Sequence, residues 1–454
     1  MSVRSASQPT APLGSSFWAY SASVTAAGLG DGVRVAALPL LAASLTSSPA
    51  LVGAVAACQS VPWLLVNPLS GALADRHDRR SLMQLATVVR VVLAVTLVAI
   101  VGLHMVDIAW LCVLGFLLGS ADTMGSNSAS GLLPRLVRGP QLERANAISQ
   151  GGYATGQNLV GPALGALLFT AARELPFSAD AVSFGIAALL LLAVAGPFPP
   201  DSRGEDRIMS EVVQGARWLW AHRPLRLLAV LVGLQNLAFG MVLSTFVLFV
   251  LDVLRLPRVL YGVLLAVMAA GGLLGSLFAY RAGVRLRRPA LLRAILVVNG
   301  LGLLAIWGLP RIWLVIPVVA LLGFLGTLWD VTVVSYRQRE TPDALLGRVT
   351  SAFRVVGIGA YPVGAALGGG LAQAAGLRVP FLAAGLVMAL AVWLSIPGLA
   401  GVDLSRSPRP AAAGGSRSRW RTPPGPAALL RGRSPSPPRR RTSRRPENWP
   451  GRSL

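Results

Sequence analysis

Long apolar stretches alternate with short polar segments along most of the chain. Twelve of these stretches are about 20 residues long, the length that spans the core of a bilayer as a helix. A soluble helical protein would instead need polar helix faces for water. The pattern therefore predicts an all-α membrane protein with twelve transmembrane helices, at residues 17–42, 50–74, 82–103, 108–130, 145–171, 177–197, 226–251, 259–281, 289–308, 312–335, 348–373 and 377–397.

The polar segments divide these spans into two groups of six. A long segment of mixed charge, 198–225, is predicted to be a cytoplasmic linker between an N-terminal bundle at 17–197 and a C-terminal bundle at 226–397. Residues 1–16 are polar and predict a cytoplasmic N-terminal segment without a cleavable signal peptide. Residues 398–454 are rich in Arg, Pro, Ser and Gly and predict a disordered basic cytoplasmic tail.

Short repeats support this division into halves. "GFLLGSAD" at 115–122 matches "GFLGTLWD" at 323–330, and "GPALG" at 161–165 matches "GAALG" at 364–368. Repeats of this kind predict two pseudo-symmetric six-helix halves related by an axis along the membrane normal.

Composition and charge give the orientation. The chain has 454 residues, of which 54% are hydrophobic and only 13% charged, and its basic residues are all arginines. With the N-terminus inside, the cytoplasmic segments before the tail hold 20 arginines and the outer loops hold 5. The positive-inside rule then predicts a multi-pass protein of the cell (inner) membrane with both termini in the cytoplasm.

The residue types needed for other chemistry are sparse. Cys58 and Cys112 lie in separate spans, and the three histidines are scattered, so neither a metal site nor catalytic residues are expected. A phosphate-binding loop needs a lysine, which the chain lacks. No enzyme activity, no cofactor and no ATP-driven step is therefore expected, and an ion gradient is left as the energy source.

Charge is concentrated in one short segment between the second and third spans. The segment "GALADRHDRR" at 71–80 places five charged residues within six positions. A second motif, "QNLVGPALGA" at 157–166, places Gly161, Pro162 and Gly165 in the fifth span. The first resembles the loop signature of the major facilitator superfamily, and the sequence around it is similar to the branch that contains macrolide-efflux and enterobactin-exporter-like proteins. The second resembles a motif of antiporter-type exporters. Asp78 and Ala166 depart from these signatures, since each stands where a glycine is usual.

The resemblance implies roles for both motifs. It implies that the charged loop is a conformational latch, made when a transporter faces outward and broken when it faces inward, with Asp75 meeting the start of the eleventh span near Gly347. The alternative is a cluster that only sets topology. The glycines and proline of the fifth span imply tight packing and a hinge. The latch residues are Gly71, Asp75, Arg76, Arg79 and Arg80.

Charged residues inside the apolar spans are costly and are therefore candidates for function. Six stand out, namely Asp31, Arg34, Arg90, Asp122, Asp330 and Arg354. Asp31 and Arg34 lie one helical turn apart, either as a structural pair or as a site for substrate or protons. Asp122 and Asp330 are expected to form gating salt bridges with arginines such as Arg79, Arg354 or those of 281–293, or else to bind protons directly. Arg90 is expected to pair with an aspartate of the N-terminal half.

Together these features predict a secondary active transporter, with proton-coupled export of hydrophobic or amphipathic small molecules by alternating access. The alternatives are transport of one specific metabolite, such as a siderophore, and a non-transporting scaffold or sensor on the same fold. The expected partners are a small-molecule substrate, protons and the lipid bilayer. The basic tail either contacts anionic lipids or has no function. A monomer is expected, and no nucleic acid is expected to bind.

The latch implies a first test. Asp75→Asn removes the charge but keeps the shape of the side chain, so transport should fall severely while membrane insertion stays unchanged. Transport assays and immunoblots of membrane fractions measure the two effects. Transport at the wild-type rate would show that the loop acts only in setting topology.

Overall fold

The structure, a computed structural model, describes residues 12–67, 69, 70, 73, 77–196, 198, 208–282, 289–342 and 345–398, and every regular element within these ranges is helical. The N-terminal half contains α1 (Ser15–Leu45), α2 (Pro49–Ser60), α3 (Pro62–Leu65), α5 (Arg79–Gly102), α6 (Ile108–Leu136), η1 (Gly139–Gln141), α7 (Leu142–Ala154), η2 (Thr155–Val160), α8 (Gly161–Ala171) and α9 (Leu175–Leu192). The remainder contains α10 (Ile208–Ala221), α11 (Arg223–Leu248), η4 (Phe249–Val253), α12 (Arg258–Ala282), α13 (Pro289–Gly308), α14 (Ile312–Glu340), α15 (Leu346–Ile358), α16 (Ala360–Ala375) and α17 (Val379–Gly398).

The helical membrane architecture predicted from the sequence is confirmed. Ten helical segments of the described chain are long and apolar enough to cross a membrane, and they coincide with ten of the predicted spans. The other two predicted spans, 50–74 and 145–171, contain interrupted helices in the residues that the structure describes. The first breaks between α2 and α3, and the second consists of α7, η2 and α8 in succession.

Prolines account for both interruptions. Pro62 begins α3, and Pro162 is the second residue of α8, which follows the π-helix η2. A proline has no amide hydrogen and its ring crowds the carbonyl four residues earlier, so the regular α-helical ladder cannot continue through it. Single π-turns of this kind are often found at functional sites.

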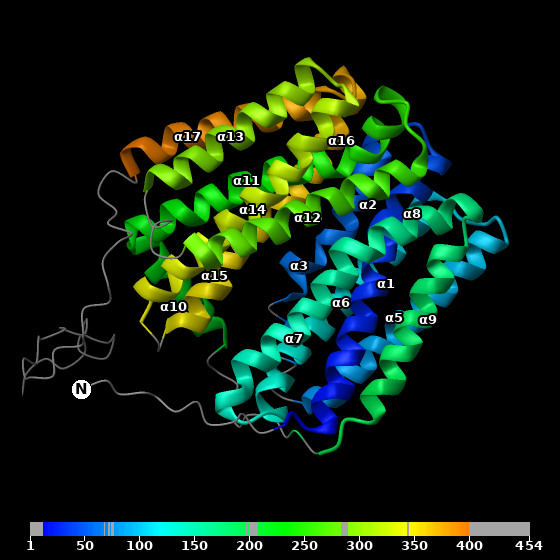
Figure 1. Ribbon diagram of the computed structural model, residues 1–454, viewed down its shortest axis with the longest axis vertical. Coiled ribbons are helices and arrows are strands. Elements are labelled where there is room, and N and C mark those ends of the chain that lie inside the picture. The colour runs from blue at the N-terminus through cyan, green and yellow to red at the C-terminus, as the bar shows by residue number, and fades with distance from the viewer. Residues whose placement is uncertain are drawn as a thin grey trace, which may run out of the picture. The chain divides into compact units, whose positions relative to one another are not determined.

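The two halves repeat the same helix packing (Figure 1). In the N-terminal half, α1 packs against α8 and α9, α5 packs against α6 and α9, and α2 packs against α6. In the C-terminal half, α11 packs against α16 and α17, α13 packs against α14 and α17, and α12 packs against α14. These pairs correspond when the helices of the second half are matched in order with those of the first. The internal sequence repeat therefore reflects a repeat in three dimensions.

The halves meet closely at two places, where α2 packs on α16 and α8 packs on α12. Glycines allow both approaches. A Cβ atom on Gly53 would lie 2.8 Å from the Cα of Gly369, and one on Gly262 would lie 2.5 Å from the Pro162 carbonyl oxygen. Beside the first contact, the Ser48 hydroxyl donates a hydrogen bond of 2.8 Å to Gln373 Oε1. We call these two contacts the inter-half seam.

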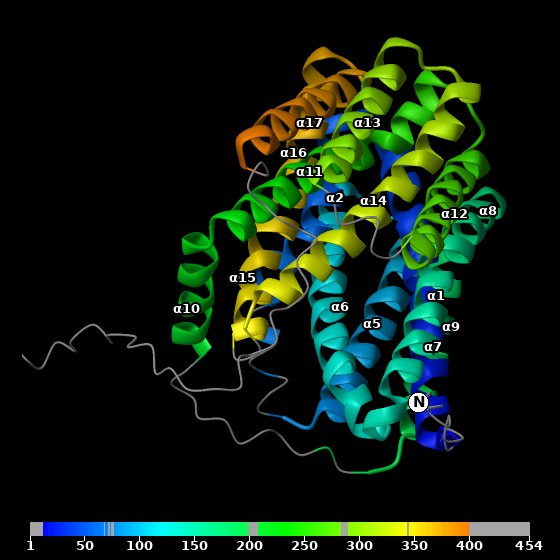
Figure 2. The same ribbon diagram turned by 60° about the vertical axis from the view of Figure 1, so that its left-hand side comes forward.

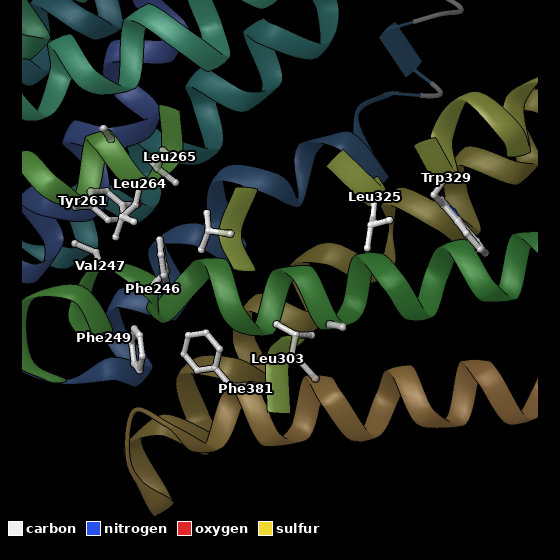
Figure 3. Close-up of a cluster of buried hydrophobic side chains, with 14 of the residues drawn as sticks. Phe246, Val247, Phe249, Tyr261, Leu264, Leu265, Leu303, Leu325, Trp329 and Phe381 are labelled. Atoms are coloured by element: carbon white, nitrogen blue, oxygen red, sulfur yellow. The ribbon is translucent and has the colours of Figure 1, made fainter. Parts of the chain in front are cut away.

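Aromatic rings fill the C-terminal half next to the seam (Figure 3). The ring centroids of Phe249 and Phe381 lie 4.4 Å apart, and those of Phe246 and Tyr261 lie 6.0 Å apart. These side chains join α11, η4, α12 and α17. Tilted aromatic pairs at such distances add to the stability gained by burial.

Part of the predicted linker 198–225 forms helix α10, which packs against α15 (Figure 2). The Arg348 guanidinium of α15 donates a hydrogen bond to Gln214 Oε1 of α10. Gly215 makes the approach possible, since a Cβ there would lie 2.5 Å from the Arg348 carbonyl carbon. The segment after the first half is thus attached to the second half.

The seam predicts the effect of a valine at either of two adjacent glycines. Gly369→Val should push α2 away from α16, whereas Gly370→Val should have little effect because no atom lies within 4 Å of a Cβ at that position. Both changes carry the same cost in helix propensity, so they form a matched pair.

The measurement is disulfide cross-linking between Ser48→Cys and Gln373→Cys, in protein whose two native cysteines, Cys58 and Cys112, are replaced by serine. We expect efficient cross-linking in this background and with Gly370→Val, and a several-fold lower yield with Gly369→Val. Equal yields for the two valine variants would contradict the close packing of the seam.

Candidate functional site

A cavity of about 720 Å³ lies between the two halves. The N-terminal half contributes residues of α1, α7, η2 and α8, and the larger part of the wall comes from α11, α12, α13, α14 and α17. Most of the lining is aliphatic, aromatic or methionine. Its apolar lining includes Val35, Leu159, Pro162, Phe239, Val242, Leu243, Phe246, Leu265, Met268, Leu303, Leu322, Trp329, Phe381 and Met388.

A few polar groups interrupt this apolar wall. Gln235 Oε1, Asn299 Oδ1 and Trp329 Nε1 are buried and have no hydrogen-bond partner among the described residues. Asn299 is 5% exposed and Trp329 is 1% exposed. Asp330 is the acidic residue of the lining, and it is exposed. Buried polar groups normally find partners, so two acceptors and one donor at the wall are suited to a bound molecule.

Five charged side chains gather in the N-terminal half, away from water. We call them the ion cluster: Asp31 and Arg34 of α1, Arg90 of α5, Asp122 of α6 and Asp180 of α9. Asp31 bridges the two arginines, through Oδ1 to Arg34 and through Oδ2 to Arg90 at 3.7 Å. Arg90 also pairs with Asp122, and Arg34 Nε lies 3.5 Å from Asp180 Oδ2.

Local structure explains how α1 supplies two members of the cluster. A separation of three residues places Asp31 and Arg34 on one helix face. Gly30 lets α9 approach, because a Cβ there would lie 2.7 Å from Asp180 Oδ1. On the far side, the ring of Phe184 covers Arg90, with the guanidinium carbon 4.9 Å from the ring centroid. Aromatic coverage of this kind favours a cation.

A chain of hydrogen bonds connects the ion cluster to the cavity. Gln157, which lines the cavity, donates from Nε2 to the Tyr153 hydroxyl at 2.8 Å. That hydroxyl donates in turn to Asp31 Oδ2 at 3.4 Å. Both residues belong to the interrupted fifth span, Tyr153 to α7 and Gln157 to η2. The interruption at η2 therefore lies between the cavity and the ion cluster.

The structure brings together four of the six charged residues singled out from the sequence. It pairs Asp122 with Arg90, and not with Arg79 or Arg354 as we expected, because α5 and α6 are neighbours in the same half. Asp330 lies in the cavity wall and Arg354 is exposed on α15. Asp180 and Tyr153 were missed. An acidic residue within the apolar span 177–197 was a signal for the first, but nothing in the sequence marked the second.

The residues of the charged loop fall into two groups. Gly71, Asp75 and Arg76 lie outside the described residues. Arg79 lies against Gly131 of α6, where an added Cβ would fall 2.5 Å from the Arg79 guanidinium carbon. Arg80 donates to the carbonyl oxygens of Leu191 at 3.3 Å and Leu192 at 3.1 Å, at the end of α9. Both arginines therefore join helices of the N-terminal half.

Asp78, where the loop signature has a glycine, directly precedes α5 as its N-cap residue. Its carboxylate accepts hydrogen bonds of 2.8 Å from the amides of Ser81 and Phe198. Burial raises the pKa of this carboxyl, but the amide hydrogen bonds outweigh it and hold the pKa below its usual value. The residue thus caps a helix and fixes the chain that leaves α9.

The motif of the fifth span lies between α1 and α12. A Cβ on Gly161 would lie 2.6 Å from the Cα of Gly32, and Gly165 packs against the Val33 backbone. Pro162 faces Gly262 across the seam. The helix that carries these residues therefore contacts the ion-bearing helix on one side and the other half of the molecule on the other.

Comparison with known proteins identifies the family. A profile of the Major Facilitator Superfamily matches residues 20–357, and the chain belongs to this family. The resemblance drawn from the two sequence motifs is thereby confirmed. The protein is a multi-pass membrane transporter that handles small molecules, and it is not an enzyme.

Curated relatives cover most of the chain. The multidrug efflux pump Tap of Mycolicibacterium fortuitum is 29% identical over 397 residues, which are 84% of this chain and 96% of the pump. Tap of Mycobacterium tuberculosis is 27% identical over 394 residues, 84% of this chain and 93% of the pump. The enterobactin exporter EntS of Shigella boydii is 25% identical over 347 residues, 75% of this chain and 81% of the exporter.

Solved structures agree with the fold. A bacterial homologue of the iron transporter ferroportin, in an inward-facing state, superposes with a TM-score of 0.68 and 16% identity, covering 87% of this chain and all of that one (100%). An inward-facing bacterial homologue of the lysosomal transporter Spinster gives a TM-score of 0.64 at 15% identity, with 84% and 96% covered. Within the described residues, no group of three His, Cys, Asp or Glu side chains is arranged to hold a metal ion.

The bridging position of Asp31 predicts a loss of stability in Asp31→Asn. The change removes the charge that both arginines share, and breaking a buried ion pair typically costs about 3–5 kcal/mol. We expect less protein in the membrane and a lower melting temperature in detergent.

Asp252→Asn is the control, because Asp252 is an exposed carboxylate on η4. Adding Arg34→Gln to Asp31→Asn should restore part of the stability, since Arg34 is the cation that loses its nearest carboxylate, whereas Arg90 keeps Asp122. An unchanged melting temperature in Asp31→Asn alone would mean that the bridge contributes nothing to folding.

Proposed function

We propose that this transporter exports hydrophobic and amphipathic small molecules, cations among them, by proton-coupled alternating access. The observation that carries the proposal is the cavity between the halves, with its apolar wall, its unpartnered polar atoms and its one acid. Its volume of about 720 Å³ suits a drug-sized molecule. An apolar wall with few fixed hydrogen bonds favours a range of substrates over one.

Orientation supports export. The excess of arginines in alternate segments supports cytoplasmic termini and a position in the cell membrane. The seam at Gly53 and Gly369 then closes the cavity toward the outside. Two solved structures of similar fold are inward-facing, and we propose the same state for this chain, with substrate entering from the cytoplasm. The relatives, a multidrug efflux pump and an enterobactin exporter, also favour export.

The remaining features fit roles in this cycle. Asp31, Arg34, Arg90 and Asp122 are proposed to couple transport to protons, because the Tyr153–Gln157 link joins them to the cavity. Gly161, Pro162 and Gly165 are proposed to form the hinge between the ion cluster and the seam. The loop 71–80 is proposed as the latch, and Arg354 as a further coupling residue on α15. The tail at 398–454 is proposed to contact anionic lipids, and the transporter to act as a monomer.

The direct test is transport in proteoliposomes of the purified full chain. The panel contains lipophilic cations, neutral amphipathic drugs and a catecholate siderophore, with and without an imposed pH gradient. We expect several unrelated apolar compounds to move against their gradients, and a protonophore to stop them. Movement of the siderophore alone would favour a specific metabolite exporter, and movement of none would favour a scaffold or sensor.

The carboxylate of Asp330 in the cavity wall predicts that cationic compounds bind more tightly than they would without its charge. Asp330→Asn should weaken binding of tetraphenylphosphonium by about 2–5-fold, the range expected when an ion pair of up to about 1 kcal/mol with an exposed carboxylate is lost. Binding of a neutral steroid should change less than two-fold. Ligand-induced changes in tryptophan fluorescence give both constants, since Trp329 lines the cavity. A similar loss for the neutral ligand would mean that Asp330 shapes the cavity without recognising charge.

A further inference from the structure

The charges of the ion cluster do not balance. Three aspartates face two arginines, which leaves one negative charge in excess when all five are ionised. The cluster is largely withdrawn from water: Asp31 is 2% exposed, Arg34 4%, Arg90 6% and Asp180 0%, and only the Asp122 side chain, at 18%, is partly exposed. An uncompensated charge in such a place costs several kcal/mol, so the folded protein favours a state in which the excess is neutralised.

The three carboxylates are not equally compensated. Asp31 forms ion pairs with both arginines and accepts a hydrogen bond from the Tyr153 hydroxyl, and Asp122 pairs with Arg90. Asp180 has only Arg34 Nε, at 3.5 Å, and neither of its oxygens accepts a hydrogen bond from the described residues. Arg34 already directs its terminal nitrogen to Asp31. Asp180 is therefore the carboxylate with the least support for a negative charge.

The surroundings of Asp180 offer no further cation. Helix α9 packs against α1, α5 and α8. Helix α1 presents Asp31 and Arg34 to the site, α5 presents Arg90, and α8, with the sequence GPALGALLFTA, carries no titratable side chain. On the far side of the cluster, Tyr153 contacts Asp31 and Asp122 contacts Arg90, so both are connected to Asp180 only indirectly. A proton is the smallest species that neutralises the site without displacing these side chains.

We propose that the ion cluster is a binding site for a single proton, held on the carboxyl group of Asp180. Binding takes a proton from a hydronium ion and leaves water and a neutral carboxylic acid, with no redox change. Release follows when Arg34 turns from Asp31 toward Asp180 and supports its negative charge. A substrate that displaces Gln157 in the cavity would loosen Tyr153 from Asp31 and so favour that turn. This last step rests on the proposed function, whereas the proton site does not.

The test is infrared spectroscopy of the purified full chain in detergent without substrate. A neutral aspartic acid gives a carbonyl stretching band that an ionised one lacks. We expect this band in the wild-type protein and its loss in Asp180→Asn, which leaves two aspartates against two arginines and should fold normally. Asp330→Asn is the matched control, a change of the same kind outside the cluster, and should keep the cluster's band. Persistence of the full band in Asp180→Asn would overturn the proposal.

Glutamate replacements locate the proton among the three carboxyls. Asparagine at Asp31 or Asp122 also balances the cluster and could remove the band indirectly, so those variants do not decide. Instead, protein is labelled with carbon-13 at the aspartate carboxyl. The introduced glutamate carries no label. In Asp180→Glu the carbonyl band of the cluster should therefore lie at the unlabelled frequency. In Asp31→Glu and Asp122→Glu the proton stays on the labelled Asp180, so the band should lie at the labelled frequency. A label-insensitive band in either of the last two would overturn the assignment, even if Asp180→Glu does not fold.

Two further measurements complete the test. Spectra in sodium and in choline buffers should agree; a band that appears only without sodium would mean that a metal cation neutralises the cluster, which contradicts the proposal. Asp180→Asn in proteoliposomes should still move substrate down its gradient but not respond to a pH gradient. If the carbonyl band comes from a carboxyl group other than that of Asp180 while wild-type transport remains proton-driven, the inference fails and the proposed function stands.

Discussion

The interaction on which the N-terminal half depends is the bridge that Asp31 makes between Arg34 and Arg90. Because all of these charges except that of Asp122 are buried, they are satisfied by other side chains, and the partners come from α1, α5, α6 and α9. The bridge therefore sets how four helices pack. It also makes the half sensitive to any change in its charge, because adding or removing one proton alters every pair in the cluster.

Charge and substrate space are divided unevenly between the halves. The ion cluster belongs to the N-terminal half, and most of the cavity wall belongs to the C-terminal half. The interrupted fifth span joins them, since Gln157 faces the cavity and Tyr153 reaches Asp31. Helix α8 then continues to the seam with α12. A movement at η2 would therefore change the ion cluster, the cavity and the contact between the halves at the same time.

Glycine decides where the halves touch. At Gly53, Gly262 and Gly369 the opposing backbones come closer than a side chain would allow. Among the described residues, the specific side-chain contacts across the seam are the hydrogen bond between Ser48 and Gln373 and the contact of the Arg258 guanidinium with the Phe169 ring. Surfaces of this kind can separate without leaving charges unpaired. They suit a seam that must open and close, whereas the ion cluster, which is costly to disrupt, lies within one half.

The sequence by itself determined the helical membrane architecture, the two halves and the family, because spans of 20 apolar residues, internal repeats and the loop signature are local patterns. It also marked Asp31, Arg34, Arg90 and Asp122, since charges inside apolar spans are rare. The spacing of Asp31 and Arg34 also indicated a possible pair within one helix, but only the tertiary structure decided the pairing of Arg90 with Asp31 and Asp122, because these side chains come from separate helices. For the same reason it alone revealed Asp180 as a member of the cluster, the link through Tyr153, and the closeness of Gly53 to Gly369, which depend on how separate helices approach in space.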